Sequence, residues 1–113
     1  MKPPSTFVTV ATVNEISPGT GKTVDVNGTW IALFNVGGTF YAVDNTCPHA
    51  GGPLGEGRLT GDIVDCPWHG WRFDVKTGER VGNPNFTVAC CHVRVVDGQI
   101  QVALPDDFDQ HRF

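Results

Sequence analysis

Hydrophobic and polar positions alternate along this 113-residue chain in short runs, with turn-forming residues between them. Alternation is the pattern of a β-strand with one covered face, and it predicts strands over residues 7–13 and 23–26. Asn27-Gly28 follows as a two-residue hairpin signal. The next run, 30–36, is almost continuously apolar, which is typical of a strand covered on both faces.

The remaining apolar runs are equally short. They predict strands over 40–43, 63–65, 71–75, 92–96 and 99–104, with turns at Gly37-Gly38, Lys76-Thr77-Gly78 and Asp97-Gly98. No segment has a helical period of useful length. We therefore expect an all-β fold built from stacked antiparallel sheets.

Length and charge narrow the class of protein. A chain of 113 residues is expected to form a single domain, here 1–113. The formal net charge of −4 disfavours nucleic acid as a partner. No run is long enough to cross a membrane, and residues 1–10 do not resemble a signal peptide. We expect a monomer in the cytoplasm with no membrane or nucleic-acid partner.

Two short runs contain the candidate chemistry: Cys47-Pro48-His49 and, sixteen residues later, Cys66-Pro67-Trp68-His69. Two thiolates and two imidazoles also suit zinc, so a Cys2His2 zinc site is the alternative. The first run is tighter than the two to four residues that usually separate zinc ligands. In a [2Fe–2S] cluster, the two ligands of one run can bind different irons. The spacing therefore favours an iron–sulfur cluster.

The longer segments around these runs resemble the two cluster-binding loops of Rieske [2Fe–2S] proteins. They read Cys47-Pro48-His49-Ala50-Gly51-Gly52-Pro53-Leu54 and Cys66-Pro67-Trp68-His69-Gly70-Trp71. The resemblance implies one Rieske-type [2Fe–2S] cluster, held by Cys47 and Cys66 on the inner iron and by His49 and His69 on the outer iron.

The resemblance also implies an architecture and extends over nearly the whole chain. A small cluster-binding subdomain, here about 44–73, is expected to be inserted between strands of a larger β core. Val81-Gly82-Asn83-Pro84 matches a third, proline-containing loop that packs against the cluster. The tail, about 105–113, has no strand pattern and is expected to be loose.

The chain departs from the high-potential Rieske proteins at four positions. In those proteins a cysteine in each loop forms a disulfide, and here Gly52 and Trp68 occupy the matching places. A Ser and a Tyr hydroxyl that donate to the cluster are replaced by Trp71 and Phe73. Fewer donors stabilise the reduced cluster less, so we predict a potential in the lower third of the Rieske range, which is roughly −150 to +300 mV.

Two cysteines and two histidines remain outside the loops, and His111 in the tail is expected to be solvated. Neighbours on a strand point to opposite faces, so Cys90 and Cys91 are not expected to bond each other. We expect both to be reduced, with one buried as a small hydrophobic residue, as in a cytoplasmic protein. His92 is interpreted as an ordinary strand residue because the four ligand positions are filled.

The loop pattern is similar to that of the ferredoxins of aromatic-ring dioxygenases and the small subunits of nitrite reductases. It implies a soluble one-electron carrier, not an enzyme in its own right, between a flavin-containing NAD(P)H reductase and a terminal oxygenase. The alternative is the small [2Fe–2S] subunit of an assimilatory NAD(P)H nitrite reductase, with the large subunit as partner. A stand-alone redox sensor or another carrier is a third possibility.

The same resemblance suggests where electrons pass. We expect the imidazole edges of both histidines at the tip of the domain, inside an apolar rim of Pro48, Ala50, Trp68 and Trp71. Trp71 is equally compatible with shielding the cluster.

Overall fold

A computed structural model describes residues 7–48, 51–68 and 70–105 of the chain. Within these residues the chain forms eleven strands and two short 3₁₀ turns, and no α-helix is found. All strand pairings are antiparallel. The all-β prediction of stacked antiparallel sheets is therefore confirmed.

The strands form three sheets. The first has the order β1 (Val8–Thr12), β11 (Gln99–Ala103), β10 (His92–Val96). The second is the meander β2 (Thr20–Val26), β3 (Thr29–Val36), β4 (Thr39–Asp44). The third has five short strands in sequence order: β5 (Arg58–Thr60), β6 (Ile63–Asp65), β7 (Arg72–Asp74), β8 (Glu79–Arg80) and β9 (Asn83–Thr87).

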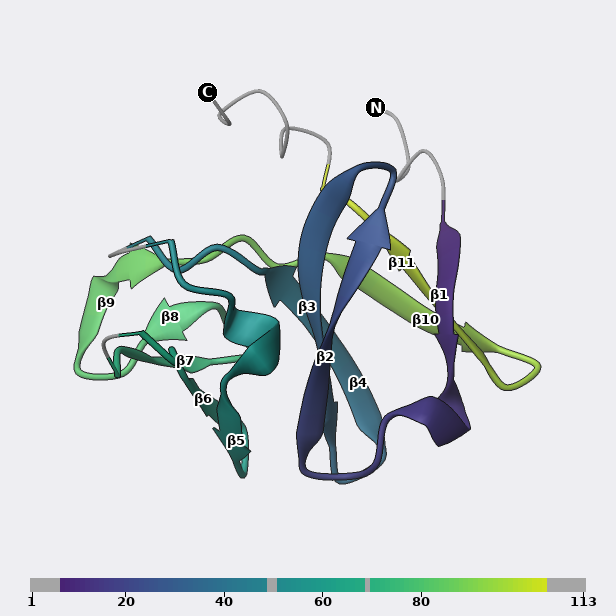
Figure 1. Cartoon of the computed structure of the whole chain (residues 1–113), viewed down its shortest axis with the longest axis horizontal. Helices are drawn as coiled ribbons and strands as arrows, with labels where there is room; N and C mark the ends of the chain where they lie inside the picture. Colours follow the sequence, from purple (N-terminus) through teal and green to yellow (C-terminus); the bar gives the residue numbers. More distant parts are fainter. Residues whose placement is uncertain (1–6, 49–50, 69, 106–113) are drawn as a thin grey trace.

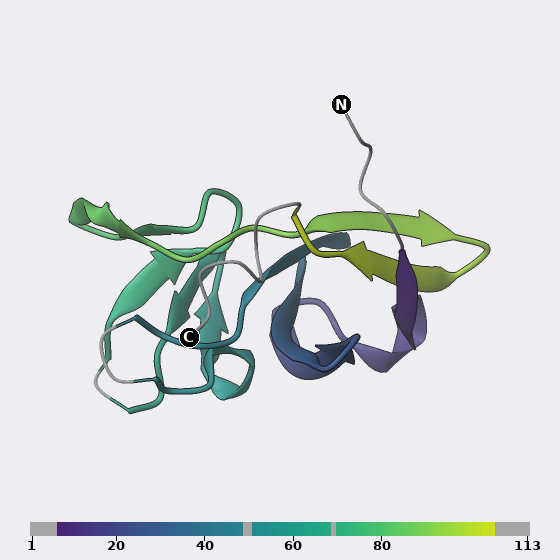
Figure 2. The same cartoon turned by 90° about the horizontal axis from the view of Figure 1, so that it is seen from above.

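The third sheet forms a lobe beside the other two sheets (Figure 1). Figure 2, turned by 90°, shows the same separation, with β10 and β11 at the opposite end of the molecule. The chain leaves the second sheet after Asp44 and returns at Cys90, which bridges Val43. Both cysteine loops and the whole third sheet lie between these two points. The predicted boundary of about 44–73 for the subdomain stays a prediction; the sheet itself continues to Thr87.

β3 joins two hydrophobic clusters. On one face, Ile31 and Leu33 pack in a cluster with Val24 and Ile100, between the first and second sheets. On the other face, Ala32 and Phe34 pack in a second cluster that covers the third sheet. Successive residues of a strand point to opposite faces, and residues 31–35 are all buried. The prediction of a strand covered on both faces is confirmed.

The hairpins follow from their turn residues. Asn27 and Gly28 have φ of 53° and 89°, and Asp97 and Gly98 have φ of 52° and 78°. Positive φ at both central residues matches the twist of the flanking strands, and Asn, Asp and Gly adopt it most readily. The predicted turns therefore fix the register of β2 with β3 and of β10 with β11.

Three strands were not predicted: β5, β8 and β9. β5 and β8 have only three and two residues, too few to show alternation. β9 contains Pro84 and is largely polar, a composition that argues against a central strand. Pro84 is accommodated because β9 is the edge of its sheet. Asn83 and Pro84, expected in a loop, thus begin a strand.

Candidate metal centre

Two loops with matching backbone geometry end next to each other in the lobe. Cys47 follows β4, and Cys66 follows β6. In each loop the cysteine N–H donates to the carbonyl five residues ahead: Cys47 to Gly52 at 3.0 Å and Cys66 to Trp71 at 2.7 Å. In each loop the cysteine carbonyl accepts from the residue four ahead, Gly51 at 2.8 Å and Gly70 at 3.0 Å. The two loops are thus closed by the same pair of hydrogen bonds.

Glycine is required at the same point of both loops. Gly51 has φ of 78° and Gly70 has φ of 76°. A side chain at positive φ is strained, and glycine has no such penalty. The glycines that the sequence places after each Cys/His pair therefore allow both loops to close, with the N–H of Gly51 and of Gly70 donating to the carbonyl of the loop's cysteine.

The two cysteine side chains are buried in one place. Cys47 is 1% exposed and Cys66 is 2% exposed, and both belong to the second hydrophobic cluster. A Cβ placed on Gly52 of the first loop would lie 2.7 Å from Cys66 Sγ of the second. The backbone of one loop thus touches the sulfur of the other. None of the four cysteines, all of which lie among the described residues, forms a disulfide.

Two of the four predicted ligands lie outside the described residues. His49 and His69 are not described, and neither is Ala50 of the predicted rim. Within the described part of the chain, no cluster of three or more His, Cys, Asp or Glu side chains is found. The assignment of the two histidines therefore stays a prediction.

The described residues fit a [2Fe–2S] cluster. Two buried thiols from matching loops can supply thiolates at a site closed to water, and Fe–S clusters are held by Cys thiolates, with His replacing two of them in Rieske centres. Glycine at position 52 leaves the space beside Cys66 Sγ free of a side chain. Each of these cysteines is followed by a His within three residues in the sequence, and these two histidines are the predicted remaining donors.

Trp71 and Phe73 pack beside the second loop. Phe73 is fully buried and Trp71 is half-buried against the same cluster. Their ring centroids are 6.4 Å apart. Neither side chain carries a hydroxyl, so neither can donate the O–H hydrogen bond that the high-potential proteins use.

A stack of side chains on Trp71 was not predicted from the sequence. The guanidinium of Arg80 lies 3.5 Å from the centroid of the Trp71 ring. Phe86 meets the same ring edge-on at 5.1 Å. Arg80 is on β8 and Phe86 on β9, two of the three strands that the sequence did not predict. Without their pairing, no spacing in the sequence brings these residues to Trp71.

Trp68 presents a different surface. It is 59% exposed, so it is available to a partner as the predicted rim requires. A Cβ placed on Gly52 would lie 3.2 Å from the Cβ of Trp68. The two positions that hold disulfide cysteines in the high-potential proteins are thus neighbours in this structure too.

Cys90, Cys91 and His92 lie away from the loops. Both cysteines line a cavity of about 200 Å³ together with Phe40, Tyr41, Ala42, Val75, Lys76 and Val93. Burial raises the pKa of Cys91 to about 12, and burial also raises the pKa of Cys90. Cys91 is half-buried and Cys90 is exposed. One of the two cysteines was expected to be buried as a small hydrophobic residue, and Cys91 is only partly so. His92 is exposed at the start of the edge strand β10.

Three comparisons relate the chain to known proteins. The family model of the Rieske [2Fe–2S] domain matches residues 6–101. The chain is 35% identical over 99 residues to Ferredoxin CarAc of Metapseudomonas resinovorans, an alignment that covers 86% of this chain and 92% of that protein. Within the described residues, we find no helix able to span a membrane.

Two solved structures have the same fold. One is a complex of reduced oxygenase and oxidized ferredoxin in carbazole 1,9a-dioxygenase, whose matching chain is 35% identical with a TM-score of 0.79, over 86% of this chain and 92% of that one. The other is a proposed NADH-dependent nitrite reductase small subunit from Mycobacterium tuberculosis, 28% identical with a TM-score of 0.81, over 88% of this chain and 96% of that one.

Proposed function

The chain belongs to the Rieske [2Fe–2S] domain family, and we propose that it is the soluble ferredoxin of an aromatic-ring dioxygenase system. It is an electron carrier, as its relatives are. The observation that carries the proposal is the 35% identity to a ferredoxin over nearly its whole length, together with the two matching cysteine loops. The proposed partners are a flavin-containing NAD(P)H reductase and a terminal oxygenase.

The proposed ligands are Cys47 and Cys66 for the inner iron and His49 and His69 for the outer iron. A bound cluster of this type accepts and returns one electron. The residues of the chain hold it and keep water from its sulfur side: both cysteines are at most 2% exposed, and both loops are closed by paired backbone hydrogen bonds.

A low potential follows from the surroundings of the second loop. Phe73 is fully buried and Trp71 packs beside it, where high-potential proteins have hydroxyl donors. Hydrogen bonds to cluster sulfurs stabilise the reduced, more negative state, so their loss lowers the potential. We place the potential in the lower third of the Rieske range, which is roughly −150 to +300 mV.

The second candidate is the small subunit of a nitrite reductase. The similarity to a proposed subunit of that kind, at 28% identity and a TM-score of 0.81, supports it. The higher identity to a ferredoxin, 35%, favours the carrier. In either role the chain transfers electrons for another protein and performs no chemistry on a substrate. We propose that it acts as a cytoplasmic monomer.

The test is a low-temperature EPR spectrum of the dithionite-reduced protein, followed by a redox titration. We expect a rhombic signal with an average g value below that of all-cysteine [2Fe–2S] centres and a potential in the lower third of the range. A colourless sample that stays EPR-silent after anaerobic reconstitution would exclude the cluster and leave the zinc alternative. Oxidation of the reduced protein by a terminal oxygenase, and not by a sirohaem nitrite reductase, would separate the two candidate roles.

A further inference from the structure

A tryptophan on β3, outside the cysteine loops in the sequence, is largely exposed to solvent. Trp30 is 60% exposed, although residues 31–35 of the same strand are buried. It lies opposite Asp25 on β2, which is also exposed. Exposure of so large an apolar ring is unfavourable in a free protein, and tryptophan is enriched among the residues that dominate binding interfaces.

Trp30 borders a depression with a rigid floor. The depression has a volume of about 430 Å³ and is lined by Thr23, Trp30, Asn45, Pro53 and Glu56. Asn45 is 7% exposed, and its Oδ1 accepts hydrogen bonds from Gly55 N at 2.7 Å and Thr23 Oγ1 at 3.2 Å. Gly55 packs so closely on Thr23 that it has no room for a side chain. The turn that carries Glu56, η2 (Leu54–Glu56), is thus held in place on β2.

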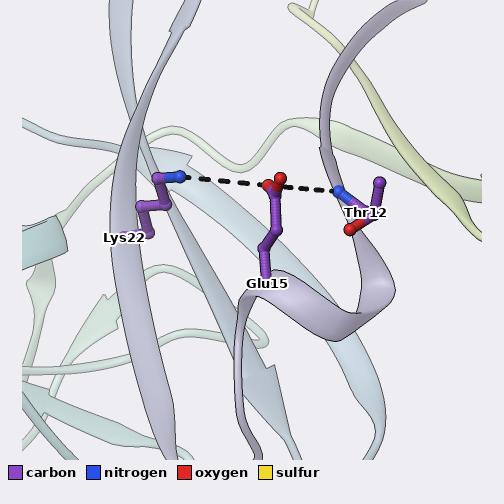
Figure 3. A network of polar contacts seen from close by, with 3 residues as sticks. All are labelled: Thr12, Glu15 and Lys22. Atoms are coloured by element: carbon purple, nitrogen blue, oxygen red, sulfur yellow. Dashed lines mark hydrogen bonds and ion pairs between the residues drawn. The ribbon is translucent and has the colours of Figure 1, made fainter.

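The rim of the depression is acidic. Glu56 lines it, and Asp25 lies across the strand pair from Trp30. β2, β3 and η2 contain one basic residue, Lys22. Its Nζ lies 3.9 Å from Glu15 Oε1, which also accepts from Thr12 N (Figure 3). Since alternate strand residues point to opposite faces, Lys22 lies on the other face of β2 from Thr23 and Asp25. Among the described residues, no cation pairs with Glu56.

We propose that this depression binds a lysine or arginine side chain on the surface of a redox partner protein. The cation lies over the face of Trp30, where the ring quadrupole attracts it, and its charge is balanced by Glu56. The inference rests on the proposed function, because an electron carrier has to dock on partner proteins.

The depression is positioned to orient a partner toward the cluster loop. Pro53, which lines it, bridges Thr46 and so closes the base of the Cys47 loop. A partner held here lies beside that loop, and contacts between electron-transfer partners are small. One cation held beside the Cys47 loop is therefore a substantial part of such an interface.

The chemistry can be tested with a basic peptide as probe. The holoprotein is produced with 5-fluorotryptophan, so that its three tryptophans give three ¹⁹F NMR signals; Trp30→Phe identifies the signal of Trp30. We expect hexa-arginine to shift the Trp30 signal saturably. Glu56→Gln should weaken the binding roughly two- to fivefold, as expected for an exposed charge pair.

The matched control is Asp97→Asn, which removes one negative charge at the β10–β11 hairpin, at the opposite end of the molecule from the third sheet (Figure 1). Asparagine tolerates the φ of 52° at this position. This variant should bind the peptide as the parent protein does. An unmoved Trp30 signal, or equal weakening in Glu56→Gln and Asp97→Asn, would overturn the proposal. If free arginine bound as tightly as the peptide, the assignment of the bound cation to the surface of a partner protein would be overturned.

The same samples separate this proposal from the proposed function. An EPR spectrum is recorded for each variant. An unmoved Trp30 signal in a parent protein with an intact Rieske spectrum refutes the docking site alone, whereas an absent spectrum in the parent protein refutes the carrier function.

Discussion

Gly52 brings the backbone of the first cysteine loop against the sulfur of the second. Its Cβ position lies 2.7 Å from Cys66 Sγ and 3.0 Å from Trp68 Cγ. The first distance is shorter than real contacts of a Cβ and the second is tighter than most of them, so a side chain at this position requires its neighbours to shift. Gly52 occupies the place of a disulfide cysteine of the high-potential proteins, and its small size allows the close approach of backbone to sulfur that glycine in this loop predicts.

Replacement of Gly52 by alanine is therefore expected to remove most of the bound iron. The methyl group displaces Cys66 Sγ, and a ligand sulfur in the wrong place cannot complete the site. The measurement is the iron-to-protein ratio with the visible spectrum. The control is Gly61→Ala, since Gly61 has φ of +63° and open space around it; it should cost about 1–3 kcal/mol of stability through backbone strain and keep its iron. Full iron content in Gly52→Ala would contradict this account of the loop contact.

Arg80 carries a permanent positive charge close to the second loop. Its guanidinium lies 3.5 Å from the Trp71 ring centroid, and the Trp71 carbonyl accepts the Cys66 N–H at 2.7 Å. A positive charge near the cluster stabilises the reduced state more than the oxidised state. Arg80→Gln is expected to lower the midpoint potential by roughly 15–60 mV, which corresponds to a charge interaction of about 0.35–1.4 kcal/mol for a one-electron couple.

The control for Arg80 is a second arginine that also stacks on an aromatic ring. Arg94 lies 4.0 Å from the Phe7 ring centroid, on the first sheet. Arg94→Gln removes the same charge and the same type of stack, and it should leave the potential unchanged. Arg80→Lys should restore most of the potential because it keeps the charge. A potential that moves equally in both Gln variants, or not at all in Arg80→Gln, would contradict a local effect of Arg80.

At the scale of elements, the sequence predicted what depends on local pattern. β3 was recognised because it is apolar at its buried positions except Asn35, and the β2–β3 and β10–β11 hairpins because Asn-Gly and Asp-Gly adopt positive φ. The loops of Cys47 and Cys66 were recognised by their spaced ligands. β8 and β9 are short and polar and are held by long-range pairing, so neither they nor the contact of Arg80 with Trp71 could be predicted.

β3 connects the lobe to the rest of the molecule through Phe34. This side chain is fully buried in the second hydrophobic cluster, and Gly21 on β2 leaves room for its ring. Phe34→Ala is expected to lower the free energy of unfolding by about 3–5 kcal/mol, measured by anaerobic denaturant titration with circular dichroism. Val96→Ala, on an exposed position of β10, should change it by no more than about 0.5 kcal/mol. Equal effects of the two variants would refute the role of β3 as the connection between layers.

At the scale of the whole molecule, the two cysteines proposed as metal ligands belong to one of the two hydrophobic clusters. The second cluster contains Cys47 and Cys66 and covers β6 and β7 through Val64 and Phe73. The first cluster, between β1, β2, β3 and β11, contains neither of these cysteines. A metal bound to the two thiols therefore ties the loops to the core of the lobe, and its binding free energy stabilises that lobe directly.

Removal of the iron is therefore expected to loosen the lobe selectively. Hydrogen exchange of the apoprotein and the holoprotein, read by mass spectrometry, should show the amides of β6 and β7 exchanging at least about tenfold faster without metal, because the opening free energy of that unit falls by about 1.4 kcal/mol or more. The amides of β10 and β11 should change by less than about threefold. Cys90→Ser, which removes an exposed thiol outside both loops, should behave as the parent protein does. Equal acceleration in all three sheets would mean that the chain opens as one unit, and that the metal stabilises the whole fold and not the lobe that holds it.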